Sequence, residues 1–229
     1  MEEKTKLTPK EWLENIWYHY KWLIIFGGLL VVFLAISLTQ LLSNKDPDVS
    51  LLYVDKMYYS DLETDIRTTT ASLADDYNGD GKTVVDMLTI TINEATDASG
   101  DPIHYDFNNT NLQRFNVEIT SGDATVLILD PEYFDICVEK GLLVKLSDVI
   151  DDAYMPKNVI NECGVKVSEL DAFKLPGFCR VEEDAIICLR RFPKEGEIKY
   201  GRTEEEWNGN KKAFVNIIKY RAETKQTEN

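Results

Sequence analysis

The stretch TVLILDPEYF, residues 125–134, decides the fold class. Residues 125–129 form a short apolar run of strand length, which is typical of a strand covered on both faces of a sheet. Asp130 and Pro131 follow at once, and an aspartate caps a helix amino terminus while proline fits the first helical turn. A buried strand that leads directly into a helix predicts an α/β fold.

The same alternation of strands and helices continues on both sides of this stretch. Apolar spacing and capping patterns predict further strands at 49–54, 83–92 and 185–190 and further helices that begin near Ser60, Asn111 and Thr203. Residues 143–178 show no clear pattern. Together, these alternating strands and helices predict an open, mostly parallel sheet with helices on both faces.

An apolar run near the amino terminus predicts a membrane span. Residues 22–44 contain no charged side chain, and about 20 of them at roughly 1.5 Å each reach about 30 Å, the thickness of the hydrocarbon core of a bilayer. The run is longer than the apolar part of a signal peptide, and no small-residue cleavage site follows it. We therefore expect one uncleaved transmembrane helix in contact with membrane lipid.

The charges flanking this run predict its orientation. Lys4, Lys6, Lys10 and Lys21 precede the run, whereas basic residues after it are sparse among acids. Cytoplasmic flanks carry the excess of lysine and arginine. We expect a single-pass protein of the cell membrane with a cytoplasmic amino terminus and an extracellular α/β domain over residues 45–229.

Residues 1–21 are predicted to form a cytoplasmic or interfacial amphipathic segment. Thr8, Pro9 and Glu11 make a strong helix start, and Trp12 and Trp17 are suited to the headgroup zone. An interfacial anchor is the simpler interpretation. The alternative is a docking helix for a cytoplasmic or membrane partner.

The composition excludes several function classes. The 229 residues carry 40 acidic and 25 basic side chains, a formal net charge of −15 that opposes binding to nucleic acid. The apolar share of 44% is ordinary for a folded chain. The two histidines, His19 and His104, lie in different predicted segments, so no site that needs two imidazoles is expected in the α/β domain.

One segment resembles a known family. Residues 121–124 (SGDA), 126–129 (VLIL), Phe134, 141–143 (GLL) and 146–148 (LSD) are similar to the first lobe of bacterial extracellular solute-binding proteins. The resemblance covers about 30 residues of degenerate motif. It implies an α/β lobe and an exterior location, without a ligand. Because about 185 residues suffice for one lobe rather than two, it implies a single-lobe, membrane-anchored relative of the kind found in Gram-positive bacteria.

A polar loop carries a candidate metal site. Residues 76–81, DYNGDG, match the opening of a calcium loop, where oxygens converge on the ion and glycine allows a sharp turn. The candidate Ca²⁺ ligands are Asp76, Asn78, Asp80, the carbonyl oxygen of Lys82, and Asp86. The closing acid of such a loop is replaced by Met87, and a strand is predicted to follow. A polar turn without an ion is therefore favoured, with calcium as the alternative.

Two aspartates are candidates for a ligand crevice. Asp55 and Asp130 each follow a predicted parallel strand, at the edge where open α/β sheets bind ligands. Helix capping is the simpler role, because both precede predicted helices. A glycoside hydrolase would instead need the two carboxylates to face each other across the substrate.

The four cysteines lack the Cys-x-x-Cys spacing of zinc and thioredoxin sites. Cys137 and Cys188 have apolar neighbours and are expected to be buried small hydrophobic residues. Cys163 and Cys179 flank loops, so free thiols and a disulfide between them both remain open.

These features favour a membrane-anchored accessory protein that binds a membrane or extracytoplasmic protein partner and is not an enzyme. The first alternative is an anchored hydrolase that uses carboxylates on envelope polymers. The second is one lobe of a solute receptor that is completed by another chain.

Overall fold

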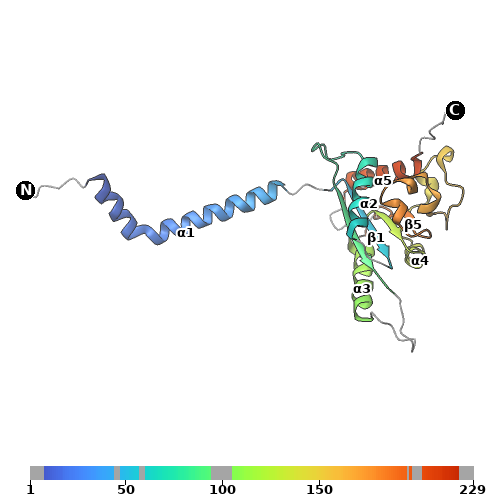
Figure 1. Ribbon diagram of the computed structural model, residues 1–229, viewed down its shortest axis with the longest axis horizontal. Coiled ribbons are helices and arrows are strands. Elements are labelled where there is room, and N and C mark those ends of the chain that lie inside the picture. Colours follow the sequence, from blue (N-terminus) through green and yellow to red (C-terminus); the bar gives the residue numbers. More distant parts are fainter. Residues whose placement is uncertain are drawn as a thin grey trace, which may run out of the picture. The chain divides into compact units, whose positions relative to one another are not determined.

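The computed structural model describes residues 8–43, 47–56, 60–93, 105–194, 196–197 and 203–221. The chain divides into two compact units, Met1–Lys45 and Asp46–Asn229. The first unit contains the helix α1 (Pro9–Ser43), and the second contains the sheet with its helices (Figure 1).

Helix α1 joins the aromatic segment to the apolar run without interruption. Its stretch Trp12–Thr39 has 28 residues and contains an 18-residue window with a mean hydropathy of 2.5, so the helix is long and apolar enough to cross a membrane. Large apolar side chains such as Leu29 and Phe33 are exposed. Figure 1 shows that α1 bends between its amino-terminal part and its longer remainder.

A five-stranded mixed sheet forms the centre of the second unit, with the strand order β2-β1-β3-β5-β4. Its strands are β1 (Val49–Asp55), β2 (Val85–Thr91), β3 (Val126–Leu129), β4 (Gly164–Lys166) and β5 (Ile186–Leu189). β1 pairs in parallel with β2 and β3, whereas β5 is antiparallel to β3 and β4. The α/β fold class is confirmed, but the prediction of a mostly parallel sheet holds only for β2-β1-β3.

The antiparallel half follows from the way the chain reaches β5. A parallel neighbour needs a crossover connection, usually a helix that returns the chain to the same end of the sheet. After α4 (Pro131–Glu139) the chain instead forms the short strand β4 and a series of single 3₁₀ turns. These turns are Leu146–Asp148, Asp152–Tyr154, Val167–Glu169, Asp171–Lys174 and Phe178–Arg180.

Helices cover both faces of the sheet, as predicted. The helices of the first face are α2 (Ser60–Leu73) and α5 (Glu204–Lys219), and those of the second are α3 (Tyr105–Ser121) and α4. Side chains alternate along a strand. In β1, Leu51 and Tyr53 therefore enter the first hydrophobic core, while Leu52 and Val54 enter the second.

Local signals explain where several helices begin. The Thr203 side chain accepts from the Glu206 N–H, and the Glu206 carboxylate accepts from the Thr203 N–H, so the predicted capping box of α5 is confirmed. A glycine inside a helix costs about 1 kcal/mol relative to alanine, but Gly209 of α5 has a packing role. A Cβ at Gly209 would lie 2.9 Å from Cγ of Tyr77.

The sequence predicted that helix α3 begins near Asn111. In the structure α3 begins earlier, at Tyr105. Two of its amides bind the end of β2: Asn111 Nδ2 donates to the Thr91 carbonyl at 2.6 Å, and Asn108 Oδ1 accepts from the Asn93 N–H at 3.0 Å. Tertiary contacts thus stabilise a polar first turn that has little apolar periodicity of its own.

Candidate functional site

The structure brings Asp55 and Asp130 to one edge of the sheet. β1 and β3 are parallel, with Val54 opposite Leu129. Asp55 and Asp130 come directly after these paired residues, so they leave neighbouring strands at their carboxyl ends. This is the edge at which α/β sheets form ligand crevices.

The Asp55 carboxylate is buried and hydrogen-bonded. Oδ2 accepts from the hydroxyl of Tyr53, which lies on the same face of β1, and Oδ1 accepts from the Lys56 N–H at 2.6 Å. Hydrogen bonds offset the cost of burying such a polar group. Residues 57–59 lie outside the described residues, so the predicted capping role of Asp55 stays a prediction.

Asp130 caps α4, as the sequence predicted. Its Oδ1 accepts from the Glu132 N–H at 3.1 Å, and Pro131 occupies the first turn. Its Oδ2 lies 2.8 Å from Nζ of Lys56. Lys56 was not singled out from the sequence, because a lysine after a strand is an ordinary surface residue until the neighbouring strand is known.

These contacts limit the chemistry of the edge. The two carboxyl groups of a glycosidase lie about 5–10 Å apart on either side of the bond that is cleaved, and both must be free to act on the substrate. Asp55 is held by Tyr53 and Asp130 by Lys56, so both carboxylates are engaged by the protein itself. The Lys56–Asp130 contact links the start of α4 to the end of β1.

The predicted calcium residues form a tightly hydrogen-bonded loop between α2 and β2. Asp76 accepts from the N–H groups of Gly79 at 2.8 Å, Asp80 at 3.1 Å and Gly81 at 2.7 Å. The side chains of Asn78 and Asp80 accept from backbone N–H groups within the same loop. Turn geometry of this kind fits the favoured interpretation of a polar turn.

The remaining predicted ligands do not complete a metal site. Asp86 is exposed on β2, and Lys82 is exposed in the loop. Within the described ranges, no group of three or more histidine, cysteine, aspartate or glutamate side chains is placed to hold a metal ion. Calcium at Asp76, Asn78 and Asp80 therefore stays a prediction.

Asp48 organises this loop and was missed in the sequence. The side chain is buried, with Oδ1 accepting from the N–H groups of Tyr77 at 3.1 Å and Asn78 at 3.4 Å and Oδ2 from that of Val84 at 2.7 Å. An aspartate beside a proline suggests a linker, and only the tertiary fold shows that its partners come from both ends of the loop.

All four cysteines are free. Cys137 and Cys188 are buried as predicted, and burial raises the pKa of Cys137 to about 11 and the pKa of Cys188 well above its usual value. Cys163 is half-buried and Cys179 is exposed. Both thiols are free, so the structure does not contain the disulfide that was the alternative for this pair.

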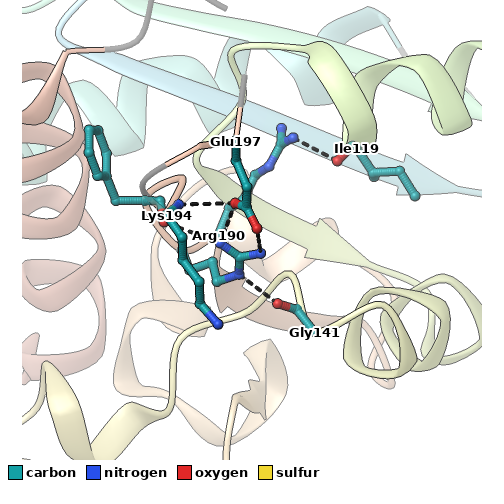
Figure 2. Close-up of polar contacts among 7 residues, drawn as sticks. Ile119, Gly141, Arg190, Lys194 and Glu197 are labelled. Atoms are coloured by element: carbon teal, nitrogen blue, oxygen red, sulfur yellow. Dashed lines mark hydrogen bonds and ion pairs between the residues drawn. The ribbon is translucent and has the colours of Figure 1, made fainter. Parts of the chain in front are cut away.

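Two consecutive arginines secure the end of β5 (Figure 2). The buried guanidinium of Arg190 donates to the carbonyls of Ile119 at 2.6 Å, Glu118 at 3.0 Å and Gly122 at 3.1 Å. These carbonyls belong to the carboxyl end of α3, where the helix dipole favours a cation. Arg190 therefore ties α3 to β5, a role with no local sequence signal.

Arg191 binds Glu197 through two parallel hydrogen bonds of 2.7 and 2.9 Å and donates to the Gly141 carbonyl at 2.7 Å. Glu197 also accepts from the Lys194 N–H at 3.0 Å. The Arg191 hydrogen bond, followed by the one from Lys194, lowers the pKa of Glu197 to about 2. The cluster holds the chain after β5 in a turn, and it engages the Arg191 guanidinium within the protein.

A pocket of about 270 Å³ lies in the irregular region after α4. It is lined by Lys145, Leu146, Ser147, Met155, Val159 and Glu162. Two of the lining side chains form an ion pair, with Lys145 Nζ 2.5 Å from Glu162 Oε2. The pocket is at the small end of ligand-binding cavities, which measure roughly 300–1,000 Å³, and its lining has no aromatic side chain.

The chain matches no model of a protein family, no curated protein and no solved structure. The resemblance of residues 121–148 to extracellular solute-binding proteins therefore stays a hypothesis.

Proposed function

We propose that the chain is a single-pass protein of the cell membrane that binds a protein partner as an accessory subunit. The observation that carries this proposal is α1, a 35-residue helix whose uncharged run from Trp22 onward has exposed apolar side chains. Exposure of apolar surface to water costs about 25 cal/mol per Å². Lipid removes that cost, and the helix is long enough to cross its hydrocarbon core.

The charge distribution supports an exterior position for the second unit. Residues 1–45 carry a net charge of +1, so residues 46–229 carry −16. Lysines before the apolar run favour a cytoplasmic amino terminus. The acidic second unit then lies outside the cell.

The edge of the sheet favours binding over catalysis. Asp55 and Asp130 are each engaged by neighbouring protein groups, which leaves little support for the alternative of a carboxylate hydrolase. The pocket beside Lys145 is small and lacks aromatic side chains, which gives little support to solute capture. A protein partner needs neither feature, because complementary surface suffices.

The native cysteines provide a direct test of orientation. Cys179 is exposed, so a membrane-impermeant maleimide added to intact cells should label a Cys163→Ser protein, in which the half-buried thiol is removed. Adding Cys179→Ser should abolish this labelling. A further Thr8→Cys change should restore labelling only after the cells are permeabilised. The reverse pattern would overturn the proposed orientation.

The accessory role is tested by cross-linking in intact cells. The matched control retains residues 1–45 and carries an unrelated exterior domain. A protein that is cross-linked to the native chain and not to the control supports the proposal. A metabolite that survives dialysis, with no cross-linked protein, would instead support the solute-receptor alternative.

A further inference from the structure

A second pocket, of about 500 Å³, lies on α1 itself. It is lined by Lys10, Leu13, Glu14, Ile16, Trp17, Tyr18, Lys21 and Ile24. Its volume falls within the roughly 300–1,000 Å³ typical of ligand sites. Since every lining residue belongs to one helix, the hollow is made by the side chains of α1 along the part of the helix that precedes the apolar run.

The pocket follows one face of the helix. Lys10, Glu14, Trp17, Lys21 and Ile24 recur at spacings of three or four residues, which places them on the same side. On a straight helix Lys10 and Lys21 would be about 16 Å apart along the axis. Figure 1 shows that α1 is not straight, and a bend gives a helix a concave side.

The lining combines positive charge with interfacial aromatic rings. Two lysines accompany one glutamate, and Lys21 Nζ lies 6.0 Å from the centre of the Tyr18 ring. Lysine is a common phosphate ligand. Tryptophan and tyrosine concentrate at the depth of lipid headgroups. Ile24 belongs to the apolar run, so the pocket extends from polar residues to the start of the span.

We propose that this pocket binds the headgroup of an anionic phospholipid in the leaflet next to the amino terminus. Lys21 and Lys10 attract the phosphate group from the two ends of the pocket, while Trp17 and Ile24 contact the upper acyl chain. The inference rests on the proposed membrane span, because lipid headgroups are the ligands present where an apolar helix leaves the bilayer. The two lysines specify an anionic lipid.

The test uses full-length protein in a nonionic detergent, titrated with phosphatidylglycerol or phosphatidylcholine and observed by native mass spectrometry. We expect phosphatidylglycerol to bind more tightly. Lys10→Gln and Lys21→Gln should each weaken it about fivefold, the effect expected of one lysine near an anionic surface. Glu14→Gln should strengthen it. The matched control, Lys140→Gln with Lys157→Gln, removes two exposed lysines of the second unit and should have no effect.

Three results would overturn the inference: equal binding of the two lipids, equal losses in the control, or displacement of phosphatidylglycerol by inorganic phosphate. Alkaline carbonate extraction of membranes separates the two proposals. If the wild-type protein is extracted, the membrane span itself is refuted. If it stays in the membrane while the lysine variants bind phosphatidylglycerol as well as wild type, only the headgroup site is refuted.

Discussion

The backbone of Gly177 has a positive φ, a conformation that strains any residue with a Cβ atom. The substitution Gly177→Ala tests how much stability depends on a glycine at this position. Its φ of 85° and ψ of −63° place it just before the 3₁₀ turn Phe178–Arg180. An added Cβ would lie 2.6 Å from the carbonyl carbon of Asp65 and 2.7 Å from the nitrogen of Ile66, both in the backbone of α2. The strain costs about 1–3 kcal/mol and the overpacking another 1–3 kcal/mol.

We therefore expect Gly177→Ala to lower the free energy of unfolding by about 4 kcal/mol, a large part of the roughly 5–15 kcal/mol of an ordinary domain. Urea unfolding of residues 46–229, which contain both hydrophobic cores, can be followed by far-ultraviolet circular dichroism. Gly79→Ala is the matched control. Gly79 has a φ of 72° with no atom within 4 Å of its Cβ position, so only the strain of about 1 kcal/mol applies. If the two variants lose the same stability, the steric reasoning is refuted.

Three further outcomes are expected from the same unfolding assay. Within the described part of the chain the buried Thr70 hydroxyl has no hydrogen-bond partner, so Thr70→Val should raise stability by about 1 kcal/mol, and a loss would show an unseen partner. Arg191 depresses the pKa of Glu197 in the folded state, so the stability contributed by Glu197 is present above its unfolded pKa near 4.5 and is lost as the pH falls toward 2. The difference in urea midpoint between wild type and Glu197→Gln should therefore shrink over that range, and a constant difference would contradict the assignment. Gly209→Ala should destabilise the second unit despite the better helix propensity of alanine, because the new Cβ meets the Tyr77 ring; a gain of about 1 kcal/mol would mean that the ring moves freely.

Features encoded over a few adjacent residues were predictable. Asp130 with Pro131 specifies the start of α4, and Thr203 with Glu206 specifies the start of α5, because each set of capping contacts is made within one turn of helix. The apolar run of α1 is equally local, since its length and composition decide its solvent.

Features that depend on distant partners were not predictable. The apolar strand Ile186–Leu189 has the same composition whether it pairs in parallel or antiparallel, so the direction of β5 was misjudged. Asp48 and Arg190 bind backbone groups far along the chain. In the sequence, Asp48 is only an acidic residue beside a proline and Arg190 only a basic residue at the end of a strand. Similarly, the sequence places Asp55 and Asp130 at strand ends but says nothing of Lys56 between them.

The position of β1 in the sheet has a mechanical consequence. β1, the strand that follows α1 in the sequence, is flanked on both sides, by β2 and by β3, and runs parallel to each. A force that acts along this strand would load both ladders of hydrogen bonds together in shear instead of opening one bond at a time. Entry through an edge strand would leave one ladder to open bond by bond, whereas entry at β1 engages two ladders, so under the proposed topology the second unit would resist a pull from the membrane.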